Sequence, residues 1–351
     1  MIFDELPVPI VLAPLAGGPS TPRLTAAVTD AGGLGFLAAG YLTTDALRTR
    51  LDETRALTRR PIGVNLFVPG RPTAPETVAR YAAGLADEAA RAGAPLGDPR
   101  FEDDEWGPKL DLLTAAPVPV VSFTFGCPSL DVIERLHRVG SEVWVTVTRE
   151  DEAVHAVGAG ADALVVQGAE AGGHRAAFVD DAADRADGIG LLSLLQLVRH
   201  AVDVPLVATG GIATGAGIAA ALAAGASAAQ LGTAFLRCPE AGTSPVHRRA
   251  LVSPAPTAMT RAFTGRLARG VLNRFLDEHS DDAPVAYPEI HHVTAPLRQA
   301  ARAAGDPDLV NLWAGQAHSL AREMPAGELV GALVEETDAA LKAATARLRR
   351  S

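Results

Sequence analysis

The sequence predicts an α/β protein built on a (β/α)8 TIM barrel, with a helical domain inserted towards the C-terminus. Short apolar runs alternate with amphipathic segments, which is the pattern of repeated βα units around a parallel sheet. Eight such runs lie between Pro9 and Phe235, and this number suits a closed barrel better than an open doubly wound sheet. No GxGxxG motif opens a helix after the first run, as a dinucleotide-binding open sheet would require.

The expected strands are short and apolar, which is typical of strands that are buried on both faces. They are Pro9–Ala16, Gly33–Gly40, Pro61–Val68, Val118–Gly126, Ser141–Thr148, Ala161–Gly168, Val204–Ile212 and Ser227–Phe235. Helical patterns lie between them. We expect helices at Pro22–Ala31, Thr43–Leu57, Pro75–Arg91, Ser129–Arg138, Asp151–Ala159, Leu191–Ala201 and Thr214–Ala224.

The βα alternation is interrupted in two places. Gly93–Pro117 is rich in proline, glycine and acidic residues, and we expect a solvated loop there. After Phe235 the alternation stops, and 237–316 is typical of helices separated by proline clusters, with no clear strand. The sequence therefore predicts a barrel of residues 1–236 plus 317–351, whose last helix lies within 326–349, and a helical, substrate-side domain of residues 237–316.

Composition excludes several classes of protein. The chain has 351 residues and a formal net charge of −10, and a negative charge without a basic stripe argues against nucleic-acid binding. No apolar run reaches the length of a membrane span, and no secretory signal precedes the first strand. The two cysteines lack metal-ligand spacing and suit a reducing compartment. We therefore expect a cytoplasmic protein that binds neither nucleic acid nor membrane and that could form an oligomer.

One strand and the loop after it carry the main signal for chemistry. The apolar run 161–166 ends at Gln167, the pair Gly172-Gly173 follows, and His174 comes next. Paired glycines let the backbone approach a ligand closely, and histidine can exchange a proton near neutral pH. This combination predicts a catalytic loop with His174 as its reactive group.

Other strand ends carry glycines and polar amides that would meet at the same barrel mouth. They include Ala13-Pro14-Leu15, Asn65, Ser122, Gln167, Gly210-Gly211 and Gln230-Leu231-Gly232-Thr233. Loops after the seventh and eighth strands of such barrels often bind phosphate through backbone N–H groups. Flavin mononucleotide (FMN) needs a phosphate site, amides for the ring edge and close backbone approach, although other phosphate-bearing ligands use the same pocket.

No metal site is expected. His291 and His292 are adjacent, but no Cys, Asp or third His lies nearby at metal-ligand spacing.

Several motifs together resemble one enzyme family. They are Ala13-Pro14-Leu15-Ala16-Gly17-Gly18, Gly32-Gly33-Leu34-Gly35, the loop 167–174, Gly210-Gly211-Ile212 and Gln230–Thr233. Three more, at 260–266, 273–275 and 312–316, extend the match into the helical part. The chain resembles the nitronate monooxygenases, formerly called 2-nitropropane dioxygenases, which are FMN-dependent (β/α)8 enzymes. The resemblance spans nearly the whole chain.

The resemblance implies a set of FMN-binding residues and a catalytic base. The resemblance implies that Asn65, Gln167, Gly172, Gly211, Gln230, Leu231, Gly232 and Thr233 hold FMN. From the strand ends and their loops we add Ala13, Pro14, Leu15, Ser122, Gly173 and Gly210 to the expected cofactor-binding residues. The resemblance also implies that His174 removes the α-proton of a neutral nitroalkane, or pairs with an anionic nitronate. The expected reaction is oxidation of alkyl nitronates, such as propionate 3-nitronate, by O2 to a carbonyl compound and nitrite.

One departure from the family concerns the substrate side. Some relatives place a lysine and tyrosines there, but this chain has no lysine between Lys109 and Lys342. Any cation near the substrate would then be Arg298 or His291, and Tyr287 is the tyrosine of that part.

Three alternative functions remain open. The first is an NAD(P)H-dependent flavin reductase of the same superfamily, of the enoyl-acyl-carrier-protein reductase or quinone reductase type. The second is an IMP dehydrogenase-like barrel, which would need a nucleophilic cysteine that 167–175 lacks. The third is a flavin-binding protein without catalytic activity.

Overall fold

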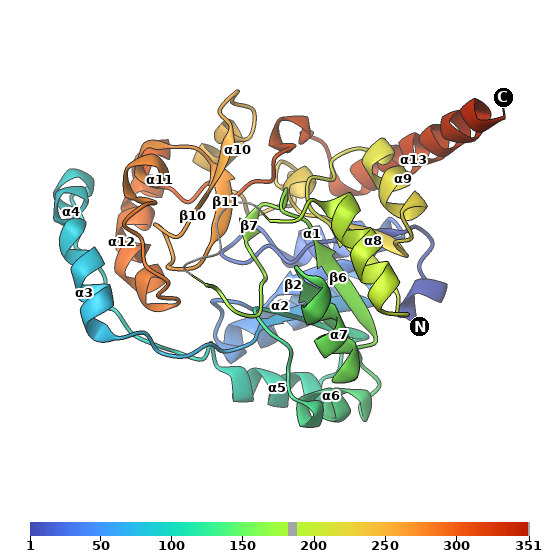
Figure 1. Cartoon of the computed structure of the whole chain (residues 1–351), viewed down its shortest axis with the longest axis horizontal. Coiled ribbons are helices and arrows are strands. Elements are labelled where there is room, and N and C mark those ends of the chain that lie inside the picture. Colours follow the sequence, from blue (N-terminus) through green and yellow to red (C-terminus); the bar gives the residue numbers. More distant parts are fainter. Residues whose placement is uncertain (182–187, 350–351) are drawn as a thin grey trace.

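Eight parallel strands form one sheet that closes into a barrel, and Figure 1 shows the whole chain. The computed structural model describes residues 1–181 and 188–349, so the last two residues of the expected barrel segment 317–351 lie outside the described residues. The strand order is β1-β9-β8-β6-β5-β4-β3-β2. A parallel bridge between Val11 and Leu34 joins the first strand to the second and closes the ring. The predicted TIM barrel is confirmed.

The barrel strands all fall within the runs expected from the sequence. They are β1 Ile10–Leu12, β2 Gly35–Ala38, β3 Ile62–Phe67, β4 Val120–Thr124, β5 Glu142–Val147, β6 Ala163–Gln167, β8 Leu206–Thr209 and β9 Ala228–Leu231. The first six residues include a short 3-10 helix, η1 Ile2–Asp4. Phe3, within η1, stacks on Trp144 of β5 at a centroid distance of 4.9 Å, so this segment closes the end of the barrel away from the expected site.

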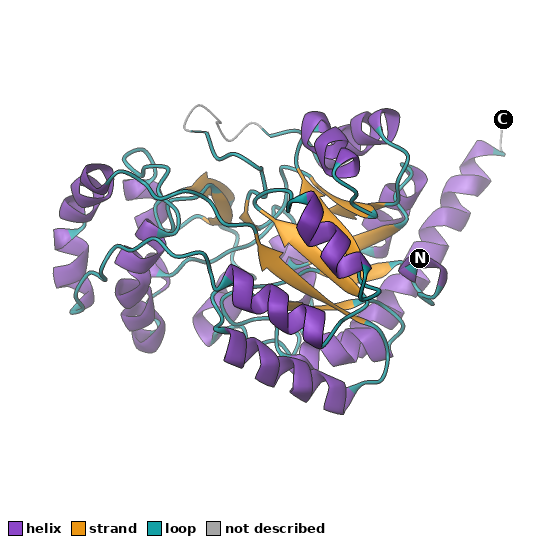
Figure 2. Ribbon diagram, turned by 90° about the horizontal axis from the view of Figure 1, so that it is seen from below, coloured by secondary structure: helices purple, strands orange, loops and turns teal. Residues whose placement is uncertain are grey.

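Helices surround the barrel strands (Figure 2). They are α1 Pro22–Asp30, α2 Thr44–Leu57, α5 Trp106–Ala115, α6 Leu130–His137, α7 Glu150–Gly158, α8 Leu191–Ala201, α9 Gly215–Ala223 and α13 Ala326–Leu348. The last of these packs against α9 and α1. Across the described ranges, none of the helices combines the length and the apolar character needed to cross a bilayer.

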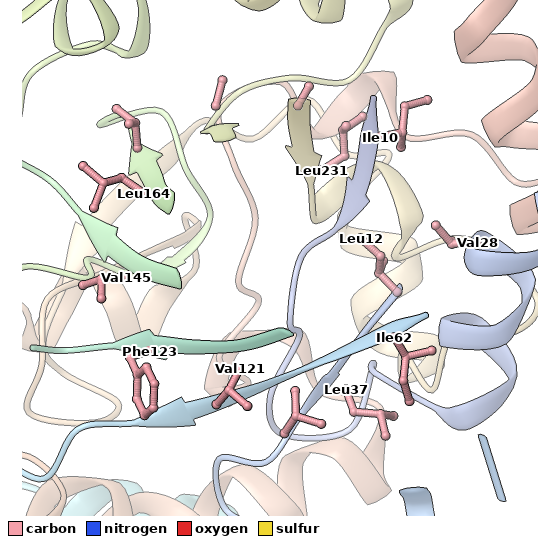
Figure 3. Close-up of a cluster of buried hydrophobic side chains, with 14 of the residues drawn as sticks. Ile10, Leu12, Val28, Leu37, Ile62, Val121, Phe123, Val145, Leu164 and Leu231 are labelled. Carbon is pink, nitrogen blue, oxygen red and sulfur yellow. The ribbon is translucent and has the colours of Figure 1, made fainter. Parts of the chain in front are cut away.

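Side chains alternate between two hydrophobic layers along each strand, because successive residues of a strand point to opposite faces. Val121 and Val145 face outward into the cluster between strands and helices (Figure 3). Their neighbours Val120 and Trp144 belong instead to a separate cluster inside the barrel, together with Phe36. The two clusters explain why the strands are apolar throughout rather than at every second position.

The expected solvated loop 93–117 is wrong in part, because it contains α5. Leu110, Leu112 and Leu113 of this helix are buried against the barrel. Pro108 lies in the first turn, where a missing N–H costs no helical hydrogen bond, so the Gly107-Pro108 pair does not end the helix. Lys109 is also buried, and it contacts Asp104 at 2.8 Å, so part of the acidic run holds this helix in place.

The expectation of no strand in 237–316 is also wrong. This stretch contains α10 Pro245–Ala250, α11 Arg274–His279, α12 Glu289–Ala304 and the 3-10 helix η3 Pro307–Leu309. It also contains two strands, β10 Thr257–Thr260 and β11 Ala268–Val271. They form a three-stranded sheet with β7, Gly173–His174. The third strand comes from about 95 residues earlier in the chain, so no local pattern within 237–316 reveals the sheet.

A third hydrophobic cluster lies outside the barrel. It combines residues of 237–316 with Val78, Tyr81 and Leu85. These three come from the expected helix 75–91, which is divided into α3 Pro75–Gly84 and α4 Ala86–Ala92 and contacts α12 rather than the barrel. Figure 1 shows α3 and α4 beside α12 on the side away from α13. The division of the chain into two domains stays a prediction.

Filling of the barrel interior gives a testable stability prediction. A Cβ atom at Gly63 would lie 2.4 Å from Cε1 of Phe36, and close packing leaves the Phe36 ring no room to move. Gly63→Ala should therefore lower the free energy of unfolding by ~1–3 kcal/mol, measured by chemical denaturation. Gly331→Ala on α13 is the control, because its Cβ would meet nothing within 4 Å. The control should raise stability by about 0.5–1 kcal/mol; equal effects of the two substitutions would contradict the packing argument.

Candidate active site

A cavity of about 560 Å³ opens where the barrel strands end. Its position follows from the alternation along the strands. On several strands, a polar residue faces inward two positions after an apolar residue that faces the barrel interior. Among these polar residues, Asn65, Thr146, Thr209 and Gln230 line the cavity. Most of the residues expected from the sequence line this cavity: Ala13, Pro14, Leu15, Asn65, Gln167, Gly172, Gly173, His174, Gly210, Gly211, Gln230, Gly232, Thr233, His291 and Arg298.

Three expected residues do not line the cavity. Ser122 lies behind Asn65, and its backbone and hydroxyl oxygens accept hydrogen bonds from Asn65 Nδ2 at 3.2 and 3.0 Å. Leu231 faces outward into the cluster under the helices. Tyr287 lies behind His174 and Tyr41, and its hydroxyl donates to that of Tyr41 at 3.2 Å. Each of the three contacts a lining residue or belongs to a strand that carries one, but none of them borders the cavity itself.

The Asn65 amide has a fixed orientation. A backbone carbonyl can only accept hydrogen bonds, so the bond to Ser122 O requires the NH2 group on that side. The same NH2 group donates to Thr124 Oγ1 at 3.0 Å. Asn65 Oδ1 therefore remains as an acceptor for a ligand in the cavity.

Gln167 holds the loop that follows it. Its Nε2 donates to His174 O at 3.1 Å, and its Oε1 accepts from Ala176 N at 2.9 Å. Arg175 Nη1 donates to Gln167 O at 2.8 Å. These three bonds connect the end of β6 to the strand that carries His174, so the barrel fixes the position of the histidine.

The loops after β8 and β9 offer free backbone donors. None of the described residues accepts a hydrogen bond from the N–H groups of Gly211, Gly232 or Thr233, and all three residues line the cavity. Gly211 has φ +68, a conformation that favours glycine. Unpaired N–H groups gathered at loop ends form a site for an anion such as phosphate.

His174 is held in an aromatic box that opens onto the cavity. β7 pairs with β11 through His174 and Ala268. The rings of Phe125, Tyr287 and Trp313 surround the imidazole at centroid distances of 5.6, 5.8 and 5.6 Å. Burial, with the positive charges of Arg266 and Arg298, lowers the pKa of the His174 imidazole to about 3. The ring is therefore neutral at pH 7, the form in which one ring nitrogen carries a free lone pair.

Arg298 is a buried cation that faces the cavity. Its Nε donates to Thr294 Oγ1 at 3.0 Å and its Nη2 to His291 O at 2.7 Å. No Asp or Glu in the described ranges lies within 4.0 Å of its guanidinium. His291 stacks on Tyr41 at 4.2 Å, and burial, with the Arg298 charge, lowers its pKa well below the usual value. A buried guanidinium without a carboxylate partner favours an anionic ligand.

Sequence reasoning missed five residues in this part of the structure: Tyr41, which stacks on His291, and then Phe125, Thr264, Arg266 and Trp313, which lie around His174. Arg266 lies over the Phe125 ring at 4.0 Å, and its Nε is buried without a partner. Thr264, Arg266 and Trp313 fall in the motifs 260–266 and 312–316 that carried the family resemblance, so those motifs could have indicated them. Tyr41 and Phe125 follow strands and have positive φ, which residue type alone does not reveal.

Within the described ranges, one group of side chains has metal-ligand spacing: Glu88, Glu278 and His279. None of the three lines the cavity. Arg274 contacts both carboxylate oxygens of Glu88, at 2.7 and 2.8 Å, so a cation already occupies the position that a metal ion would take.

Comparisons with known proteins agree with this geometry. The chain is 42% identical over 338 residues to a nitronate monooxygenase from Pseudomonas aeruginosa, covering 93% of this chain and 95% of that protein. It is 41% identical over 347 residues to one from Paraburkholderia phytofirmans, with 93% and 92% covered.

Solved structures are also similar. Nitroalkane oxidase from Streptomyces ansochromogenes has a TM-score of 0.96 at 54% identity, over 97% of this chain and 99% of that one. FabK from Thermotoga maritima has a TM-score of 0.75 at 27% identity, over 99% and 97%. A family model described as nitronate monooxygenase matches residues 3–336. The chain therefore belongs to the nitronate monooxygenase family of oxidoreductase enzymes.

Proposed function

We propose that the protein is an FMN-dependent enzyme that oxidises alkyl nitronates, such as propionate 3-nitronate, with O2 to a carbonyl compound and nitrite. The observation that carries this proposal is Arg298, a buried guanidinium that lines the cavity together with His174. A second buried guanidinium, Arg266, lies behind it over the Phe125 ring. Neither arginine has a carboxylate within 4.0 Å among the described residues. Such a site favours a small anion, and a nitronate is one.

The residues of the cavity fit FMN. The free N–H groups of Gly211, Gly232 and Thr233 suit its phosphate. Asn65 Oδ1 is an acceptor for the ring N–H, and the Gln230 side chain, which has no partner among the described residues, can serve the ring carbonyls. A cavity of about 560 Å³ is in the usual range for a cofactor site. Bound there, FMN would supply an electron acceptor, which no protein side chain of the cavity provides.

The protein's own groups prepare the substrate. Arg298 holds the negative charge of a nitronate in a site that excludes bulk water. When the substrate is a neutral nitroalkane, His174 takes the α-proton, and the imidazolium and nitronate that result stabilise each other. Arg298 then stabilises the same nitronate. The aromatic rings around His174 keep water from competing for the proton.

The direct test is anaerobic mixing of the purified, flavin-containing protein with propionate 3-nitronate. We expect the absorbance of the oxidised flavin to fall, and nitrite to form when oxygen is admitted. An unchanged spectrum would contradict the proposal. Rapid bleaching by NADH without nitronate would support the reductase alternative instead, and a flavin that responds to neither compound would support the non-catalytic one.

His174→Asn tests the base. The amide keeps a polar group in the box but cannot take the proton, so turnover of neutral nitroalkanes should fall by roughly 100- to 10,000-fold. Oxidation of pre-formed nitronates needs no proton removal and should change much less. Steady-state kinetics with nitroethane and its nitronate measure both. Equal losses with the two substrates would show that the base role is wrong.

Arg298→Met tests the anion site, and here the larger effect is expected with nitronates rather than with neutral nitroalkanes. Loss of a charged hydrogen-bond partner costs about 1.5–3 kcal/mol, so KM for nitronates should rise by roughly 10- to 100-fold. KM for neutral nitroalkanes should change little. Arg298→Lys is the matched control, because it keeps the charge and should recover part of the affinity for nitronates. A rise in KM that is the same for both substrate forms would show that Arg298 does not bind the anion.

A further inference from the structure

The Thr264 hydroxyl bonds to the imidazole of His174, and both residues line the cavity. Its Oγ1 lies 2.9 Å from His174 Nε2. The same oxygen lies 3.2 Å from the backbone carbonyl oxygen of Arg266 and 3.4 Å from the Arg266 backbone nitrogen. Thr264 is 1% exposed, so bulk water does not replace any of these partners.

A count of protons decides the direction of each bond. A threonine hydroxyl has one proton to donate and two lone pairs that accept. The Arg266 carbonyl can only accept, and no other donor among the described residues reaches it. A buried carbonyl without a partner is unfavourable, so the hydroxyl proton goes to that carbonyl. Thr264 Oγ1 then accepts from the Arg266 N–H and from His174 Nε2–H.

We propose that Thr264 fixes His174 as the Nε2–H tautomer, so that Nδ1 presents its lone pair to the cavity. This inference rests on the proposed function, in which His174 takes the α-proton of a neutral nitroalkane. Nδ1 has no hydrogen-bond partner among the described residues, and His174 lines the cavity. The structure thus assigns the proton-accepting atom, and Thr264 is a positioning residue that acts through the imidazole.

The surrounding backbone holds both partners of this bond. Thr264 N and Gly265 N both donate to Arg261 O, at 3.1 and 2.7 Å, in the turn between β10 and β11. His174 is paired with Ala268 at the start of β11. When Nδ1 gains a proton, Nε2–H keeps its bond to Thr264, so proton transfer requires no rearrangement of the ring.

The test compares Thr264→Val, which has nearly the same shape but no hydroxyl, with Thr264→Ser, which keeps the hydroxyl. NMR of holoprotein with isotope-labelled histidine ring nitrogens separates the two tautomers by their couplings to ring protons. The His174 signal is assigned by its loss in His174→Asn. We expect the Nε2–H pattern in the wild type and in Thr264→Ser, and a shift towards the Nδ1–H pattern in Thr264→Val. A wild type in the Nδ1–H form, or an unchanged pattern in Thr264→Val, would overturn the inference.

Kinetics then separate this inference from the proposed function. Thr264→Val should lower kcat for nitroethane by roughly tenfold or more, with KM and the oxidation of ethylnitronate nearly unchanged, and Thr264→Ser should recover most of the rate. Unchanged signals of the other histidines exclude misfolding of the variant. If the tautomer shifts as expected but nitroethane turnover does not fall, the assignment of the tautomer stands and the base role fails.

Discussion

The two-residue period of the barrel strands is the constraint on which the site depends. It places an apolar side chain inside the barrel, such as Val120 or Trp144, and then a polar one two residues later, such as Ser122 or Thr146. Phe36 and Trp144 fill the lower interior. Because large rings occupy that half, the open space is left at the strand ends, where the polar side chains and glycines of the loops meet. One alternation therefore creates both the core and the cavity.

A second constraint brings the histidine to this cavity. Gln167 holds the loop of His174 from the barrel side, and the β7–β11 pairing holds it from the outer sheet. Residues from both sides then surround the imidazole: Phe125 follows the barrel strand β4, and Trp313 belongs to the stretch 237–316 that carries β10 and β11. The electrostatics follow from this enclosure, because burial beside two arginines keeps the ring neutral.

The barrel and the residues at its strand ends that line the cavity could be predicted from the sequence, because strand periodicity and glycine placement are local signals. Much of the remaining lining comes from residues that the sequence did not single out. The outer sheet could not be predicted, since β7 joins β10 and β11 across a long stretch of chain. The helix α5 was hidden by Gly107-Pro108, residues that end a helix in most contexts but are tolerated in its first turn. Thr264 and Arg266 belonged to a motif that could be matched, but their contacts with the histidine exist only in three dimensions.

The most direct test of the proposed cofactor site is a crystal structure of the flavin-containing protein. We expect a phosphate bound by the N–H groups of Gly211, Gly232 and Thr233, with the isoalloxazine ring across the barrel mouth and His174 Nδ1 facing its reactive side. A phosphate bound elsewhere, or a flavin ring separated from His174 by other side chains, would contradict this expectation.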